Sequence, residues 1–289
     1  GLTTIDVATT FTTTGHLIIL FLIQLGGIGI MTFTSFFGLM FAGKHLSQNK
    51  MLIKDLIDPE NSVSQIFTTL RNIILITLSV ELLGALFIYE AMGNYTLYGA
   101  FVAIFHSVSA FCNAGFSTLE TGLFHPDFRN NYLLLNSLSW LIIFGGIGFP
   151  ILFNIWQWIK VRCLLAYDTI FRRNRRIFDH NARTLTSNTV IAIIMTIILV
   201  VGGTIIFFMT EYNNVLRDDT SLWGKLSTSF FLATVPRTAG FASFNMGSLT
   251  SISVVIMIIY MWIGGSPMST AGGIKTTTFA IALLNVINT

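Results

Sequence analysis

The pentapeptide Asn113-Ala114-Gly115-Phe116-Ser117 is a polar loop centred on glycine, and a long apolar segment follows it as far as Gly145-Gly146-Ile147-Gly148. The same order occurs twice more. Gly1-Leu2-Thr3-Thr4 precedes Gly26-Gly27-Ile28-Gly29, and Arg237-Thr238-Ala239-Gly240-Phe241-Ala242 precedes Gly264-Gly265-Ser266-Pro267. The offsets from loop glycine to double glycine are 25, 30 and 24 residues. This repeat predicts several similar loops around one axis, each followed by a helix that is interrupted at a double glycine.

The composition is that of an integral membrane protein. Only 10% of the 289 residues are charged and 53% are hydrophobic, with a mean hydropathy of +0.74, whereas soluble domains carry about 25% charged residues. A helix needs roughly 20 apolar residues to cross the bilayer core. The chain is therefore expected to be an all-α, multi-pass protein of the lipid bilayer. Five segments are each interpreted as a membrane helix or most of one: 16–41, 66–92, 132–159, 187–210 and 247–263.

The basic residues predict an orientation for these helices. Lysines and arginines gather in the connections 42–65 and 160–186 and are sparse in 93–131 and 211–246. The positive-inside rule places the first pair in the cytoplasm of a cell membrane and the second pair, with the glycine loops, outside. We interpret the cluster from Arg172 to Arg176 as a topology signal, in preference to a site for a specific partner or an anionic lipid.

Each outward connection holds a short apolar run, 97–112 or 222–236, ahead of its glycine loop. Such runs are too short to cross the bilayer but apolar enough to enter it. Non-helical backbone at membrane depth must be covered by protein or by pore water. We therefore predict units of helix, pore helix, filter loop and helix, arranged pseudo-symmetrically around one pore as in potassium channels. The second half of a first repeat covers 1–41, followed by a connection at 42–65, a second repeat at 66–162, a basic connection at 163–186 and a third repeat at 187–289.

The glycine loops are predicted to bind a monovalent cation through main-chain oxygens. Dehydrating such an ion requires a ring of oxygen dipoles, which potassium channels supply from the backbone carbonyls of four short loops. Glycine is needed because carbonyls that all point inward require dihedrals forbidden to most side chains. The large apolar residue after each glycine is expected to anchor its loop. The candidate filter residues are Gly1, Leu2, Asn113, Ala114, Gly115, Phe116, Thr238, Ala239, Gly240 and Phe241.

A second candidate site interrupts the last apolar helix. The segment 264–278 contains four glycines, a proline and a run of hydroxyl residues, and it follows only 17 residues of the apolar run 247–263. It is therefore expected inside the membrane, where broken helices mark ion or substrate paths. We predict that it is a gate below the filter. Its candidate residues are Gly264, Gly265, Ser266, Ser269, Thr270, Ala271, Gly272, Gly273 and Lys275.

We also predict the roles of four individual residues. For Lys275 we favour a role in gating over a side chain that merely reaches the cytoplasmic interface. Arg237 is expected to support the third filter loop by donating to carbonyls or to an acid. For Glu81 we favour a structural hydrogen bond over ion coordination, since a carboxylate inside a membrane helix needs a partner. His106 is expected to be packed and hydrogen-bonded.

Several stretches resemble the Trk/Ktr/HKT superfamily of potassium transporters. Phe105 to Ser117 is similar to the second pore loop of that family, and Thr234 to Phe241 is similar to the third. The opening residues Gly1 to Thr4, with Phe11 to Thr13 and Gln24 to Thr32, resemble the stretch that comes after the first filter. The string Pro236 to Phe241 and the segment Gly264 to Thr278 bring the chain closest to KtrB, the membrane subunits of Ktr uptake systems. The resemblance covers essentially all 289 residues.

The resemblance implies that this chain is part of a potassium-translocating subunit. It implies potassium (K+) as the transported ion, held by filter carbonyls, with sodium (Na+) as a second candidate and no organic cofactor on this chain. It further implies a homodimer on a cytoplasmic ring of nucleotide-binding KtrA-type subunits, sodium-dependent uptake in many members, a gating loop at 264–278, and a fourth repeat beyond Thr289.

Three alternatives stay open. One is a TrkH-like transporter subunit with a different regulatory partner, and another is a structural membrane protein that transports nothing. The third is a membrane-embedded enzyme or receptor. The apolar segments carry no paired carboxylates, no His/Cys metal set and no nucleophile with a base, which argues against an enzyme. The sequence also lacks a basic domain of the kind that binds nucleic acid.

Overall fold

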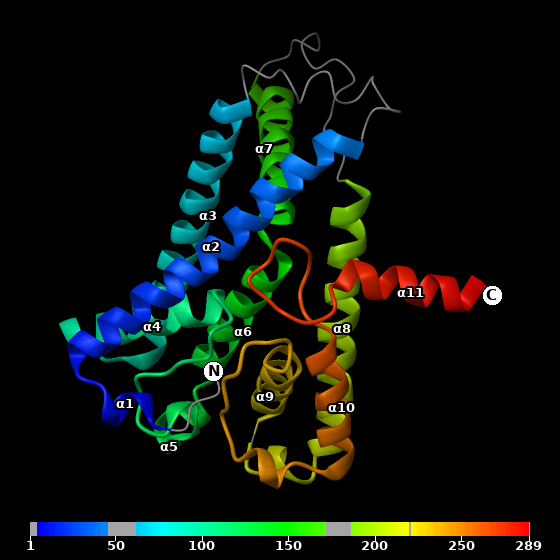
Figure 1. Cartoon of the computed structure of the whole chain (residues 1–289). Coiled ribbons are helices and arrows are strands. Elements are labelled where there is room, and N and C mark those ends of the chain that lie inside the picture. The colour runs from blue at the N-terminus through cyan, green and yellow to red at the C-terminus, as the bar shows by residue number, and fades with distance from the viewer. Residues whose placement is uncertain (1–4, 46–61, 172–185, 220, 289) are drawn as a thin grey trace.

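A computed structural model describes residues 5–45, 62–171, 186–219 and 221–288 (Figure 1). The regular secondary structure of these residues is helical, and the single bridge that the model shows pairs Ile263 with Ile274. The helices Leu70–Met92 and Asn188–Glu211 are each long and apolar enough to cross a membrane. The helices Tyr132–Ile147 and Phe149–Cys163 are long and apolar enough only when taken together, and they meet at a bend of 100°, as in a broken span or a re-entrant loop. The all-α class predicted from the sequence is confirmed.

Two successive groups of helices have the same order: a long helix, a short helix, a loop and a broken helix. The first comprises α3 (Ser62–Met92), α4 (Leu97–Phe111), α6 (Tyr132–Ile147) and α7 (Phe149–Phe171). The second comprises α8 (Ser187–Glu211), α9 (Leu222–Thr234), α10 (Ser251–Trp262) and α11 (Thr276–Asn288). Ahead of both lie α1 (Val7–Thr10) and α2 (Thr13–His45). The connections hold α5 (Pro126–Arg129) and the short 3-10 helices η1 (Gly122–Phe124), η2 (Val215–Arg217) and η3 (Met246–Ser248).

The two short helices start in the same way. The Thr96 hydroxyl accepts a hydrogen bond from the Gly99 N–H at 3.0 Å, and the Ser221 hydroxyl accepts one from the Gly224 N–H at 2.9 Å. Such caps satisfy N–H groups that have no partner within the helix. Both short helices therefore begin at a hydroxyl residue that is followed three positions later by glycine.

The helix ends that border the two basic connections lie on one side of the molecule. In Figure 1 the C-terminal ends of α2 and α7 and the N-terminal ends of α3 and α8 are all at the top. If both connections lie in one compartment, these four helix ends must lie on the same side of the molecule, as they do. Most of the basic residues themselves, including the cluster from Arg172 to Arg176, lie outside the described residues, and the cytoplasmic assignment stays a prediction.

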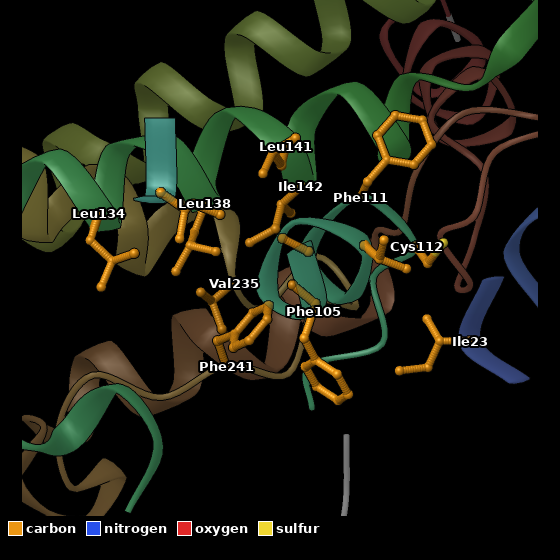
Figure 2. Close-up of a cluster of buried hydrophobic side chains, with 14 of the residues drawn as sticks. Ile23, Phe105, Phe111, Cys112, Leu134, Leu138, Leu141, Ile142, Val235 and Phe241 are labelled. Atoms are coloured by element: carbon orange, nitrogen blue, oxygen red, sulfur yellow. The ribbon is translucent and has the colours of Figure 1, made fainter. Parts of the chain in front are cut away.

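The largest core lies where α3, α4, α6 and α9 meet (Figure 2). Phe105 and Phe111 of α4, Leu138 of α6 and Phe231 of α9 are almost fully buried there. The outward faces of the long helices instead expose large apolar side chains, such as Leu82 of α3 at 62% and Ile198 of α8 at 56%. Exposed apolar surface on that scale suits contact with lipid and not with water.

The outer connections of the two groups are joined by polar contacts. Arg129 at the end of α5 forms an ion pair with Asp218 at 3.0 Å. The buried Asp219 carboxylate accepts from the Tyr132 hydroxyl at 2.9 Å and from the Thr228 hydroxyl at 2.9 Å. These contacts hold the start of α6 against the start of α9, so the two loops that follow the short helices have a common frame.

The expectation that every returning helix breaks at its double glycine is wrong in two places. The helix α2 continues through Gly26 and Gly27 without a break. In the second group the break lies at Gly148, which has φ +86, so 132–159 is not one straight span. Glycine within a helix lowers its stability without ending it, whereas a positive φ is incompatible with a right-handed helix.

The last apolar run is also shorter as a helix than the sequence suggests. The helix α10 has 12 residues, about 18 Å at the rise of an α-helix, which is too short to cross the bilayer core alone. The chain then leaves helical structure and returns to it at Thr276. The predicted gate segment 264–278 is therefore too long at its C-terminal end, because Thr276 to Thr278 form the first turn of α11. In Figure 1, α11 turns sideways away from α10 and α8.

Candidate functional site

The two described glycine loops share an unusual backbone pattern. Asn113 and Gly115 have φ +52 and φ +69, and Thr238 and Gly240 have φ +76 and φ +81. The residue between them is not left-handed in either loop. In extended backbone, successive carbonyls point to opposite sides, whereas alternating left- and right-handed dihedrals turn successive carbonyls to the same side. A β-branched threonine at positive φ is a conformational outlier that its surroundings must hold in place.

The short helix α4 accepts hydrogen bonds from several N–H groups of the second loop. The N–H of Asn113 donates to the Ala110 carbonyl at 3.1 Å, and that of Ala114 donates to the Ser109 carbonyl at 2.8 Å. The Ser109 hydroxyl both accepts from the Phe116 N–H at 2.9 Å and donates to the Phe116 carbonyl at 2.8 Å. With its N–H groups held against α4, this loop is fixed from behind.

His106 extends this support and links the two loops. One ring nitrogen lies 2.8 Å from the Val102 carbonyl, and the other lies 2.8 Å from the Ser117 hydroxyl. The imidazole also stacks on Phe241 of the third loop, with ring centroids 6.5 Å apart. His106 is 1% exposed, so the expectation of a packed, hydrogen-bonded histidine is confirmed.

In the two described loops, the apolar residue after the glycine packs against the core, as expected of an anchor. Phe241 is 3% exposed and lies in the same core as Phe105 and Val235, as Figure 2 shows. Phe116 packs against this core with part of its side chain exposed. Because one core includes both anchors, the second and third loops lie side by side.

Each short helix ends just before its loop. The last residue of α4 is Phe111, two before Asn113, and the last of α9 is Thr234, four before Thr238. The C-terminal end of a helix carries the negative end of its dipole, which stabilises a nearby cation. In addition, the side-chain oxygens Asn113 Oδ1 and Thr238 Oγ1, at equivalent positions in the two loops, have no hydrogen-bond partner among the described residues.

Residues 263–275, which we call the gate loop, leave the helix and return to it at the same place. The Gly264 N–H donates to the Ile274 carbonyl at 3.1 Å, and the Ile274 N–H donates to the Trp262 carbonyl at 2.9 Å. A Cβ at Gly264 would stand 1.7 Å from the Gly272 carbonyl oxygen. The ends can close this tightly only because glycine has no side chain.

The gate loop is hydrogen-bonded to the double glycine of α6. The Ser266 N–H donates to the Gly146 carbonyl at 2.8 Å, and the Thr270 N–H donates to the Gly145 carbonyl at 3.3 Å. The Thr270 hydroxyl also donates to the Phe111 carbonyl, the last of α4, at 3.0 Å. Three segments therefore meet here: the end of a pore helix, the bend of a returning helix and the gate loop.

Arg237 contributes to the gate loop. Its guanidinium donates to the Gly264 carbonyl at 3.4 Å, and its side chain is 6% exposed. The expected carbonyl acceptor is present, but it lies on the gate loop and not on the filter loop. The Nε of Arg237 has no hydrogen-bond partner among the described residues.

Lys275 closes the gate loop on itself. Its half-buried ammonium group donates to the Ala271 carbonyl at 2.7 Å. This intraloop bond fits a lysine that holds the loop in shape better than one that extends to the membrane interface. Ser269 also stabilises the shape of the gate loop, because its hydroxyl donates to the Ser266 carbonyl at 2.6 Å.

Glu81 makes the structural hydrogen bonds expected of it. Its carboxylate accepts from the Gln24 amide at 2.9 Å and from the Cys112 thiol at 3.7 Å. The Ser107 hydroxyl bonds the Glu81 carbonyl at 2.6 Å. Glu81 is 4% exposed, and its carboxylate joins α2, α3 and the end of α4 one residue before Asn113.

A recess of about 380 Å³ opens beside the second loop. Its lining includes Gly115, Ser117 and Asp6. The Asp6 carboxylate caps α1 through the Ala8 N–H at 2.9 Å and lies 3.4 Å from the Thr121 N–H. The segment after the first glycine loop thus lies beside the end of the second.

The structure brings together most of the residues that the sequence selects. The second and third loops adjoin one core, and the gate loop is hydrogen-bonded to Asn113 of the second and to Arg237 at the start of the third. Gly1 and Leu2 of the first loop lie outside the described residues. Neither Ser109 nor the Phe111 carbonyl was among the residues selected from the sequence. For Ser109 there was one available signal, which is that hydroxyl residues are unusual on the otherwise apolar α4.

Gly145 lies so close to the end of α4 that we expect its replacement to destabilise the fold. An added Cβ would stand 1.8 Å from the Phe111 carbonyl oxygen, a backbone atom. We expect Gly145→Ala to destabilise the full-length protein by roughly 2 kcal/mol or more through overpacking, which lowers the melting temperature by several degrees. The control is Gly146→Ala, whose nearest neighbour is the Ala271 Cβ at 4.0 Å. Equal melting temperatures for the two detergent-solubilised variants would contradict this account of the junction.

Comparison with known proteins connects this architecture to a family. The sequence model of TrkH, described as a cation transport protein, matches residues 1–288. The chain is 31% identical to the potassium/sodium uptake protein NtpJ of Enterococcus hirae, over 99% of this chain and 58% of that protein. It is 32% identical to the Ktr system potassium uptake protein B of Vibrio alginolyticus, over 98% of this chain and 58% of that protein.

A solved structure has the same fold. The potassium transporter TrkH from Vibrio parahaemolyticus superposes with a TM-score of 0.68 at 18% identity, covering 100% of this chain and 52% of that chain. The chain thus spans somewhat more than half the length of the proteins it resembles.

Proposed function

The chain belongs to the TrkH family of cation transport proteins, and we propose that it forms part of a potassium-translocating pore in a cell membrane. Membership of this family makes the chain a component of a transporter and not an enzyme. The chain is a multi-pass membrane protein with apolar helices. We place the ion path along the carbonyls of the glycine loops, where Ala114, Gly115, Ala239 and Gly240 are central.

The paired left-handed dihedrals in the two described loops are the observation that carries this proposal. They recur at equivalent positions in segments 125 residues apart, from Gly115 to Gly240. A glycine that only allows close packing does not require a left-handed residue two positions earlier. In an ion path lined by carbonyls, a second left-handed residue is expected, because the oxygens must face the ion from one side of the chain to replace its hydration shell. The C-terminal ends of α4 and α9 add a favourable potential for a cation.

We further propose that the gate loop obstructs this path from below. Its hydrogen bonds to Phe111 at the end of α4 and to Gly145 of α6 support a position at the base of the second filter loop. The hydrogen bond from Gly264 to Ile274 holds the two ends of the gate loop together, so the loop would move as a unit.

The finer assignments rest on the resemblance to Ktr membrane subunits. We propose potassium as the main cargo, with sodium as a second ion, and an outward-facing position for the filter loops with 42–65 and 160–186 in the cytoplasm. We also propose a homodimer on a ring of nucleotide-binding KtrA-type subunits.

The test is ion uptake by the full-length protein. We expect its gene to restore entry of rubidium, a potassium substitute, and growth at low potassium in cells that lack their own potassium uptake. Cells with an empty vector provide the background. If the protein reaches the membrane but rubidium entry stays at background, with and without a KtrA-type partner, the pore proposal fails.

A further inference from the structure

A single hydroxyl of the gate loop bridges the pore helix and the second filter loop. The Thr270 hydroxyl donates to the Phe111 carbonyl at 3.0 Å and accepts from the Asn113 side-chain amide at 2.9 Å. Phe111 ends α4, and Asn113 is the first left-handed residue of the filter loop. The gate loop is thus hydrogen-bonded to the very residue whose dihedral sets the direction of the next carbonyls.

Thr270 is held in this position from two sides. Its N–H donates to the Gly145 carbonyl of α6 at 3.3 Å. Its methyl group lies 3.7 Å from where a Cβ would stand on Gly27 of α2. The two double glycines therefore leave the space in which a threonine side chain reaches Asn113.

The third filter loop lacks such a bridge among the described residues. Thr238 stands at the position equivalent to Asn113, and its hydroxyl has no hydrogen-bond partner there. Its methyl group lies 3.8 Å from where a Cβ would stand on Gly272. Among the described residues, the gate loop thus makes a side-chain hydrogen bond to the left-handed residue of the second filter loop alone.

Asparagine adopts a left-handed backbone more readily than most residues, yet at a cost in free energy that its contacts must offset. When the gate loop is seated, the hydrogen bond from Asn113 to Thr270 contributes to this offset. When the gate loop withdraws, Asn113 loses that partner and keeps only its bonds to α4, from its N–H to the Ala110 carbonyl and from its amide to the Phe111 carbonyl at 3.4 Å, so less of the cost of the left-handed backbone is offset. The carbonyls of Asn113 and Ala114 would then turn away from the ion path.

We propose that Thr270 is a positioning residue for selectivity: by holding Asn113, the seated gate loop keeps the second filter loop in its potassium-selective form. This rests on the proposed function. It adds that discrimination between potassium and sodium depends on the position of the gate loop. The filter is most selective when the gate loop is seated, and it becomes less selective when the gate loop withdraws.

The experiment compares rubidium and sodium entry through the full-length protein. Initial rates are measured for the parent, Thr270→Val, Thr270→Ser and Thr204→Val, in cells without other potassium uptake, with the amount of protein in the membrane quantified. Valine keeps the shape of threonine and removes the hydroxyl, whereas serine keeps the hydroxyl. Thr204 is the control, because it is half-buried in α8 and its hydroxyl donates to Val200 of its own helix at 2.7 Å.

We expect Thr270→Val to lower the ratio of rubidium to sodium entry roughly fivefold, the equilibrium effect of losing one neutral hydrogen bond. Thr270→Ser and Thr204→Val should keep the parent's ratio. Asn113→Leu should lower the ratio at least as far, because it also removes the contact to the Phe111 carbonyl and places leucine at φ +52. Adding Thr270→Val to Asn113→Leu should lower the ratio no further, because the bond between the two residues is already gone.

A gate loop that only obstructs the pore gives a different result. Thr270→Val would then raise both rates in proportion and leave the ratio unchanged, which overturns the inference while the proposed function stands. Additive losses in the double variant overturn it as well. A parent that admits neither ion overturns the proposed function itself.

Discussion

Replacing Gly115 or Gly240 with serine is expected to reduce rubidium entry roughly tenfold or more, because a side chain at left-handed dihedrals costs 1–2 kcal/mol and turns the carbonyl when the strain is relieved. The two glycines have φ +69 and φ +81. Oxygens that leave the ion path no longer replace the water that potassium gives up. Discrimination against sodium should fall together with the rate, and both are read from initial rates of rubidium and sodium entry.

The matched control is Gly93→Ser. Gly93 also has a left-handed backbone, with φ +62, and nothing lies within 4 Å of where its Cβ would stand. It follows the end of α3, outside both glycine loops, so the same strain arises at a site that lines no ion path. We expect uptake near that of the parent. Unchanged rate and selectivity in both filter variants would show that these loops are not the filter.

Removal of 266–273 is expected to raise basal rubidium entry roughly tenfold, because the deletion discards the hydrogen bonds from Ser266 and Thr270 that seat the gate loop, each worth ~1 kcal/mol. The retained residues Gly264 and Ile274 are hydrogen-bonded to each other at 3.1 Å, so the new junction between Gly265 and Ile274 has only a short gap to close. The measurement is unstimulated rubidium entry per molecule of protein in the membrane.

A second variant identifies the route of the leak. Gly240→Ser in the deletion background should abolish most of the added entry, because an ion that passes the missing gate must still pass the third filter loop. Leakage that persists in this double variant would mean that ions cross elsewhere. Basal entry equal to the parent's in the single deletion would show that the gate loop does not obstruct the path.

Sequence patterns that act locally predicted much of the fold. Long apolar runs identified α3 and α8 as spans, and short runs identified α4 and α9 as helices within a few residues. The glycine repeats selected the two loops whose backbone is left-handed. These features depend on the hydropathy of each segment and on the backbone freedom of its glycines, and both can be read from the sequence.

The same reasoning was wrong where neighbours in space decide. Gly26 and Gly27 stay within a continuous α2, whereas Gly148 ends α6, although the three residues occur in nearly identical motifs. A Cβ at Gly148 would stand 2.9 Å from the Met268 carbonyl oxygen of the gate loop. Which glycine becomes a bend thus depends on a segment more than a hundred residues away.

The sequence by itself determined that this is a membrane protein with repeated glycine loops behind short apolar helices, since hydropathy and glycine tolerance are properties of each segment alone. Only the tertiary structure decided which polar groups meet: Glu81 with Gln24 across 57 residues, and Asn113 with Thr270 across 157. The physical reason is that a buried polar group must find a partner wherever the folded chain supplies one. That choice depends on how the helices pack, and no local pattern contains it.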